Sequence, residues 1–236
     1  MALVVLTTQT PHHAYFVREL TRDVPVAACL LETRPVSAPY PTAHPFEGER
    51  DLYERELWFG GGGEELSDHA ECHRVERCND AVAVALLTRL RPRVTVVFGT
   101  ARLSPAVIAA AGEIVNLHGG DPRDYRGLDT HLWAVWHDDF DGLVTTLHDL
   151  TAELDAGAIV GHGKVPLRPG MRLAELRAAN TELCLALTRR ALAERRRDGR
   201  FIAVPQRRKG RYYSFMPTAL KEACVRKFKR HTERLR

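Results

Sequence analysis

Short apolar runs that alternate with helical segments constrain the fold of this chain most strongly. Leu3–Thr7 (LVVLT) is brief and rich in β-branched residues, as a buried parallel strand is. A helical pattern follows, with Thr10 suited to cap it and Pro11 to its first turn, and VPVAACLLE (Val24–Glu32) is a second strand. This β-α-β start predicts an α/β fold with a doubly wound, mostly parallel sheet.

The same alternation continues toward the C-terminus. We expect helices over Asn79–Pro92, from Ser104, and over Leu173–Arg197, and strands at Val94–Gly99, Glu113–His118 and Gly142–Leu150, the last followed by a tight turn and a strand within Thr151–Val160. Residues 33–63, with several prolines and the run FGGGG, are expected to form a long irregular loop.

The composition indicates a globular protein of the cytoplasm. Hydrophobic residues make up 44% and charged residues 27% of the chain, which is ordinary for a soluble domain. No apolar run approaches the roughly 20 residues that span a bilayer, and the N-terminus lacks the pattern of a signal peptide. We therefore expect no membrane partner, and the odd number of cysteines, 5, indicates reduced thiols.

One cluster, DHAECHRVERC, offers His69, Cys72, His73 and Cys78. His69 and His73 would share one face of a helix, as a pair of metal ligands does. No second pair follows at zinc-finger spacing. We expect a polar helix or loop here, and no metal.

A more specific pattern lies at the end of the strand EIVNLH. Asn116 and His118, two residues apart, project from one face, and Gly119 and Gly120 let the backbone turn closely around a ligand. Ligands of open α/β sheets bind beyond the carboxyl ends of the strands. From these residues alone, a binding site and a structural histidine with its asparagine are both open. Asp155 sits in a turn from which a carboxylate can point into the same cleft.

Together with Tyr125-Arg126-Gly127 and LDAGAIV (Leu154–Val160), this pattern resembles the N10-formyltetrahydrofolate-dependent formyltransferases. The stretch that carries the resemblance runs from Arg93 to Val165, about a third of the chain. The resemblance implies the Rossmann-like formyltransferase fold and N10-formyltetrahydrofolate as formyl donor. It places the catalytic residues at Asn116, His118 and Asp155.

This chemistry suits those residue types. An amine that attacks the formyl carbon gives a tetrahedral intermediate, whose oxyanion Asn116 and a protonated His118 can stabilise. Asp155 would orient His118 and favour its charged form while the proton leaves the amine. The resemblance also implies that the pterin contacts two turns, at Phe98, Ala101, Arg102, Leu103, Thr151 and Glu153.

The acceptor is expected to be a small primary amine, namely an amino sugar on a nucleotide. The turn TTQTPHHAY lacks the glycine-rich phosphate loop of a glycinamide ribonucleotide enzyme, and we expect no C-terminal barrel of the tRNA-acting type. The segment GGDPRDYRG adds Asp121, Arg123 and Asp124 to the expected mouth of the site. Residues assigned to acceptor binding are Gln9, His12, His13, Gly120, Tyr125 and Arg126.

The C-terminal segment has a different charge from the rest of the chain. We divide the chain into a catalytic domain, residues 1–205, and a basic helical appendage, residues 206–236, with 11 Lys/Arg against 2 Glu. Leu220, Cys224, Phe228 and Leu235 form an apolar stripe that packs on the main domain or on a second copy in a homodimer. Two alternatives remain: a formyltetrahydrofolate deformylase, and a nucleic-acid-binding protein on this scaffold. The complete Asn-His-Asp set disfavours nucleic acid.

Overall fold

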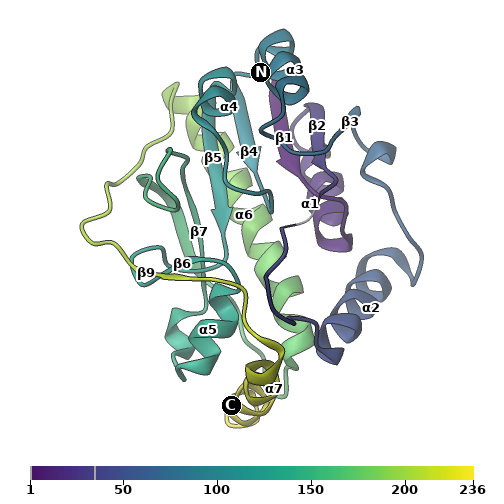
Figure 1. The fold of residues 1–236 in the computed structure, drawn as a ribbon, viewed down its shortest axis with the longest axis vertical. Coiled ribbons are helices and arrows are strands. Elements are labelled where there is room, and N and C mark those ends of the chain that lie inside the picture. Colours follow the sequence, from purple (N-terminus) through teal and green to yellow (C-terminus); the bar gives the residue numbers. More distant parts are fainter. Residues whose placement is uncertain (1, 35) are drawn as a thin grey trace.

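A seven-stranded sheet organises the computed structural model, which describes residues 2–34 and 36–236. The strand order is β3-β2-β1-β4-β5-β7-β8 (Figure 1). These strands span β1 (Leu3–Thr7), β2 (Val26–Glu32), β3 (Cys72–Val75), β4 (Val94–Val97), β5 (Glu113–His118), β7 (Val144–Asp149) and β8 (Ile159–Lys164). The first five are parallel, and β7 and β8 are antiparallel to their neighbours. The predicted fold class is confirmed.

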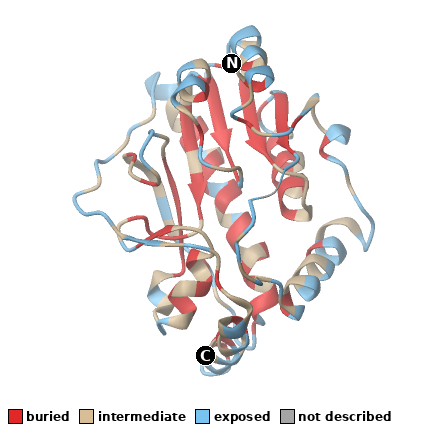
Figure 2. Ribbon diagram, in the orientation of Figure 1, coloured by how far each residue is buried: buried red, intermediate tan, exposed pale blue. Residues whose placement is uncertain are grey.

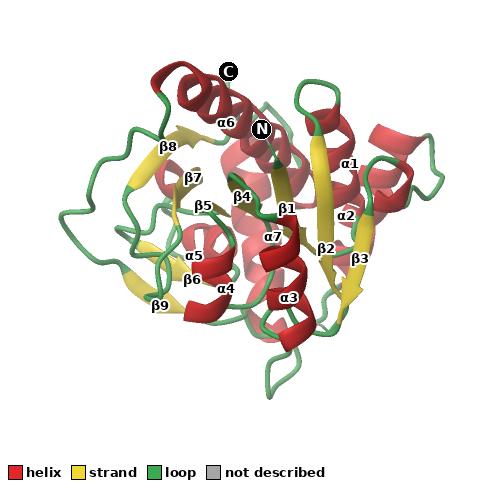
Figure 3. Cartoon of the chain, turned by 90° about the horizontal axis from the view of Figure 1, so that it is seen from above, coloured by secondary structure: helices red, strands yellow, loops and turns green. Residues whose placement is uncertain are grey.

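Helices cover both faces of this sheet. The helices of the chain are α1 (Pro11–Thr21), α2 (Pro45–Phe59), α3 (Ala81–Leu90), α4 (Pro105–Ala110), α5 (Thr130–Trp136), α6 (Leu176–Asp198) and α7 (Thr218–Thr232). Helices α1 and α6 lie on one face, and α3 and α4 on the other (Figure 3). Alternate residues of β1 enter the two cores, Val5 with Phe16 of α1 and Val4 with Leu87 of α3, because successive strand side chains point to opposite faces.

The prediction of an irregular loop over residues 33–63 is wrong for α2. The His44 ring accepts from the backbone N–H of Phe46, and the Glu47 side chain accepts from the backbone N–H of His44. This capping box, with Pro45 in the first turn, starts the helix. Only Phe46 and Glu54 of α2 are buried, so its sequence lacks the apolar periodicity that reveals a helix.

The prediction of a polar helix or loop around Cys72 is wrong as well, because this segment forms a strand. β3 pairs in parallel with β2, with Cys29 opposite Cys72. It lies at the edge of the sheet, and its residues CHRV form no apolar run. An edge strand that is only partly buried needs no such run.

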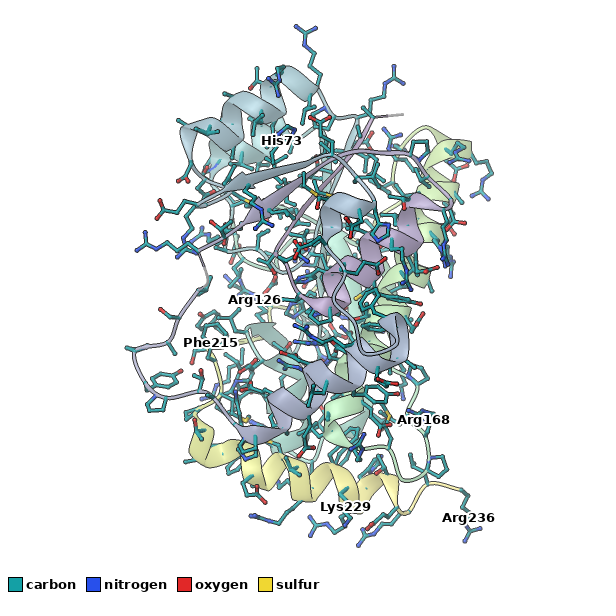
Figure 4. All side chains as sticks on the ribbon, turned by 90° about the vertical axis from the view of Figure 1, so that its right-hand side faces the viewer. His73, Arg126, Arg168, Phe215, Lys229 and Arg236 are labelled. Atoms are coloured by element: carbon teal, nitrogen blue, oxygen red, sulfur yellow. The ribbon has the colours of Figure 1, made fainter. Side chains whose placement is uncertain are left out.

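The C-terminal residues pack against the rest of the chain. A short strand β9 (Arg211–Tyr213) pairs in parallel with β6 (Tyr125–Gly127). The predicted C-terminal helix is confirmed as α7, whose Cys224 and Phe228 are fully buried in a third apolar cluster. Lys229 points away from the body (Figure 4). Leu220 packs against the same cluster, so three of the four residues of the apolar stripe are covered within one chain, and the boundary at residue 205 remains a prediction. In the described part of the chain, no helix is long and apolar enough to cross a membrane.

Candidate functional site

A cavity of about 650 Å³ opens at the carboxyl ends of the central strands. Figure 2 shows that these central strands are buried. Of the residues predicted for the site, the cavity wall includes His12, His13, Phe98, Ala101, Arg102, Leu103, Asn116, His118, Thr151, Glu153 and Asp155. The predicted catalytic residues and both predicted pterin turns therefore meet in one cavity.

His118 is held at the end of β5 with its two ring nitrogens facing different groups. Nε2 lies 2.7 Å from the carbonyl oxygen of Tyr125, and Nδ1 lies 3.7 Å from Oδ2 of Asp155. A carbonyl oxygen only accepts, so Nε2 carries a hydrogen. In the neutral ring, Nδ1 is then unprotonated and faces the carboxylate.

Burial and the neighbouring charges favour a neutral His118 beside an ionised Asp155. Burial lowers the pKa of His118 below its usual range, although Asp155 acts in the opposite direction. For Asp155, burial acts to raise the pKa, but the charge of a protonated His118, the proximity of His148 and the Gly127 N–H together lower it to about 2. Asp155 is therefore ionised near neutral pH, and Nδ1 of His118 is ready to take a proton.

His148, on β7, lies beside the predicted catalytic residues, and the sequence pattern did not point to it. Its Nε2 lies 3.2 Å from Nδ2 of Asn116 and 3.5 Å from Oδ1 of Asp155. Its Nδ1 lies 2.8 Å from the carbonyl oxygen of Asp149, so the neutral ring donates from Nδ1 and accepts from Asn116 at Nε2. The second amide hydrogen of Asn116 remains for a ligand. His148 is the register partner of Asn116 in the antiparallel β5–β7 pair, which no local pattern reveals.

The two predicted pterin turns are joined by a side chain. The guanidinium of Arg102 donates from Nε to the carbonyl oxygen of Ala152 at 3.1 Å, and Thr151 donates to the carbonyl oxygen of Glu153 at 3.0 Å. Glu153 itself forms an ion pair with Lys209 of the C-terminal segment. These contacts hold Arg102 and Glu153 in place in the cavity wall. Both residues were predicted to contact the pterin.

His12 and His13, in the first turn of α1, form another part of the cavity wall. Thr10 does not cap this helix as expected, because its hydroxyl lies 2.9 and 2.8 Å from Nδ1 of these two rings. Burial lowers the pKa of His13 to about 3, and that of His12 well below its usual range. Both rings are therefore neutral and serve as hydrogen-bonding groups.

Two arginines that the sequence analysis missed also line the cavity. Arg177 of α6 binds Glu54 through two hydrogen bonds of 2.7 and 2.6 Å, so its charge is balanced. Arg50 of α2 contacts Asp51 at 3.3 Å through Nε. Arg50 lies in the segment that was expected to be a loop, which is why no signal pointed to it.

Four residues predicted to bind the acceptor lie behind the cavity wall. Gln9 bonds to Glu64 and Leu66, and the carbonyl of Gly120 accepts from Thr146. Tyr125 and Arg126 bond to Asp139 and Leu154 (Figure 4 labels Arg126). Because these groups are already engaged with the protein, they support the wall and do not form it. The expected mouth residues Asp121 and Arg123 pair with each other at 2.6 Å, and Asp124 pairs with Arg208.

The histidine and cysteine cluster holds no set of metal ligands. His69 contacts Glu64 at 2.7 Å, and His73 contacts Glu71 at 3.1 Å. Among residues 2–34 and 36–236, no three His, Cys, Asp or Glu side chains converge as a metal site. These histidines form separate acid–base pairs.

Comparison with known proteins supports the resemblance. The chain is 38% identical over 81 residues to phosphoribosylglycinamide formyltransferase of Escherichia coli (strain K12). This alignment covers 34% of the chain and 38% of that protein. The aligned stretch thus spans little more than a third of this curated relative. No family model matches the chain.

Solved structures show the same fold over nearly the whole chain. HypX from Aquifex aeolicus, in complex with tetrahydrofolic acid, has a TM-score of 0.61 and 19% identity, over 94% of this chain and 31% of that one. A sugar N-formyltransferase from Shewanella sp FDAARGOS_354 has a TM-score of 0.60 and 14% identity, over 91% and 77%. The chain therefore shares the fold of HypX and of a sugar N-formyltransferase, and about a third of it is similar in sequence to a phosphoribosylglycinamide formyltransferase, in agreement with the predicted resemblance.

Proposed function

We propose that this protein transfers a formyl group from N10-formyltetrahydrofolate to a primary amine. One observation carries the proposal: Asn116, His118 and Asp155 meet in a single cavity, with Nδ1 of His118 beside the Asp155 carboxylate. A base next to a fixed anion and an amide donor is what acyl transfer to an amine requires.

The reaction balances without any further reagent. The amine nitrogen bonds to the formyl carbon, and an N–H group of Asn116 stabilises the resulting oxyanion. His118 takes one proton from the attacking nitrogen at Nδ1, where the Asp155 charge stabilises the imidazolium. The bond from the formyl carbon to N10 then breaks, and that proton is delivered to N10. The products are tetrahydrofolate and an N-formyl amine.

The donor is proposed to lie against the two turns that Arg102 joins. Backbone groups of Ala101, Leu103 and Thr151 can read the amide-like edge of the pterin, and Phe98 supplies apolar contact. These residues line the cavity together with the catalytic group. Tetrahydrofolic acid is bound by the structurally similar HypX, which supports a folate in this site.

For the acceptor we favour an amino sugar carried on a nucleotide. The similarity to a sugar N-formyltransferase supports this class. In the cavity wall, the neutral rings of His12 and His13 suit hydroxyl groups, and Arg50 suits a phosphate. Five free cysteines support a reducing compartment, which we propose to be the cytoplasm.

The observations give the nucleic-acid alternative little support. Lys221 and Lys227 of α7 are held by Glu47 and Asp138 at 2.8 and 2.6 Å. Arg208 and Lys209 likewise pair with Asp124 and Glu153. These four basic residues are thus neutralised within the chain, which weakens attraction to a phosphate backbone.

The test is to incubate the protein with N10-formyltetrahydrofolate and a panel of amines: nucleotide-linked amino sugars, free amino sugars and amino acids. We expect tetrahydrofolate and the N-formyl product to appear together with a nucleotide-linked amino sugar. Formation of tetrahydrofolate and formate without any amine would identify a deformylase instead. Absence of turnover with every amine would overturn the proposal.

A further inference from the structure

The C-terminal segment crosses the outer side of the turn that carries Asp155. Val204 pairs with Ile159 through two backbone hydrogen bonds of 2.8 Å. Figure 1 shows the chain leaving α6, running along the outer side of the molecule and entering β9 next to β6. Gln206 follows Val204 by two residues, so this pairing sets its position against the turn.

The side-chain amide of Gln206 holds this turn at two points. Its Nε2 donates to the carbonyl oxygen of Asp155 at 2.9 Å and to that of Gly157 at 2.7 Å. An amide nitrogen carries two hydrogens, so both bonds form at once. Asp155 has φ of +50°, a left-handed conformation that disfavours a residue with a Cβ atom. Such a conformation persists only where surrounding contacts enforce it.

The inner side of the turn is held by β6. The N–H of Gly127 donates to Oδ2 of Asp155 at 2.8 Å, and Nε of Arg126 donates to the carbonyl oxygen of Leu154 at 3.0 Å. β6 is itself paired with β9, which continues the segment that carries Gln206. Both sides of the turn therefore depend on residues 204–213.

We propose that Gln206 is a positioning residue for formyl transfer. By holding the backbone of Asp155, it keeps the carboxylate beside Nδ1 of His118 and Nε2 of His148. The inference rests on the proposed function. It gives the C-terminal segment a role in organising the catalytic group, in addition to burying the apolar stripe.

The pKa of His118 depends on the position of the Asp155 carboxylate. Asp155 acts to raise its pKa, as do Asp121 and the hydrogen bond with Tyr125, while His148 acts to lower it. His131 of α5, also in the cavity wall, is neutral because burial lowers its pKa to about 4. Of these groups, Asp155 is the one that the side chain of Gln206 holds. A displaced Asp155 therefore raises the pKa of His118 less.

The experiment compares Gln206→Ala and Gln206→Met with wild type, and uses Arg207→Ala as control because Arg207 is the exposed next residue. Met keeps the length of the side chain and removes both donors. We expect kcat to fall by roughly 10- to 100-fold in both Gln206 variants, as for a displacement of about 1 Å at a reacting group. The KM values should stay within about twofold, and the acid limb of the pH–rate profile should move to lower pH.

A second measurement does not depend on the reaction. Histidine NMR titration of the same proteins, with His118 assigned through His118→Ala, should show a lower pKa for His118 in both Gln206 variants. If the wild-type protein does not transfer a formyl group, the proposed function is wrong. The titration still tests whether Gln206 positions Asp155 beside His118. Unchanged kcat and pH profile would overturn the inference, as would an unchanged titration. Failure of both variants to fold would also overturn it, because Gln206 would then be a purely structural residue.

Discussion

The Nε2 atom of His148 lies between two of the predicted catalytic residues, 3.2 Å from the amide nitrogen of Asn116 and 3.5 Å from Oδ1 of Asp155. One imidazole therefore sets the orientation of the oxyanion donor and faces the anion that supports His118. The proposed catalytic group thus comprises four side chains, from β5, β7 and the turn after β7.

This relationship predicts a defect when His148 is replaced by Phe, which keeps much of the ring but offers no nitrogen to Asn116. We expect kcat to fall by on the order of 10-fold, because the amide loses its fixed orientation. The binding of tetrahydrofolate, measured by calorimetry, should change by less than about threefold. Normal turnover by His148→Phe would show that Asn116 is oriented without it.

Asp155→Asn should lower kcat by at least about 100-fold and change its pH dependence. In wild type, Asp155 acts to raise the pKa of His118 against the effect of burial. Without that charge the pKa of His118 falls, and His118 stays neutral to lower pH. Because a neutral His118 is the base, the acid limb of the pH–rate profile should shift to lower pH. A shift to higher pH, or none, would contradict the assigned pair.

Arg50→Gln tests the proposed phosphate contact of the acceptor. A charge-assisted hydrogen bond contributes about 2 kcal/mol, so the KM for a nucleotide-linked amine should rise by roughly tenfold or more. The affinity for tetrahydrofolate should be unchanged. Arg55→Gln is the matched control, because Arg55 lies on the same helix and is exposed. Equal effects of both variants on KM would remove Arg50 from the acceptor site.

Phe228→Ala tests whether the C-terminal helix belongs to the folded unit. Phe228 is fully buried in the apolar cluster with Leu132 and Met216. Its truncation should lower the free energy of unfolding by about 3 kcal/mol in urea titrations, whereas the exposed Lys229→Ala should change it by less than about 0.5 kcal/mol. Removing the last 20 residues should destabilise the protein further. A fully stable truncated protein would show that α7 is an independent appendage.

The sequence reveals those parts of the fold whose signal is local. Leu3–Thr7 is an apolar run that identifies a buried strand, and the apolar residues within Glu113–His118 identify another, which places Asn116 and His118 near its carboxyl end. Helix α2 could not be predicted from the sequence because it buries only Phe46 and Glu54. A helix that covers little apolar surface leaves no periodic trace.

The missed members of the site depend on contacts between distant segments. His148 reaches Asn116 through antiparallel pairing across 32 residues. Gln206 reaches Asp155 across 51 residues. Neither spacing has a local pattern, so only the fold brings these side chains together.

The central claim is tested most directly with N10-formyltetrahydrofolate that carries ¹³C in the formyl group, followed by ¹³C NMR with a nucleotide-linked amino sugar. In wild type, and in the His73→Ala control, the label should move to an N-formyl carbon in amounts equal to the tetrahydrofolate formed. In His118→Ala, the rate should fall by at least about 100-fold, with tetrahydrofolate binding retained. Label that collects in free formate, or a His118→Ala variant that transfers it at the wild-type rate, would contradict the account.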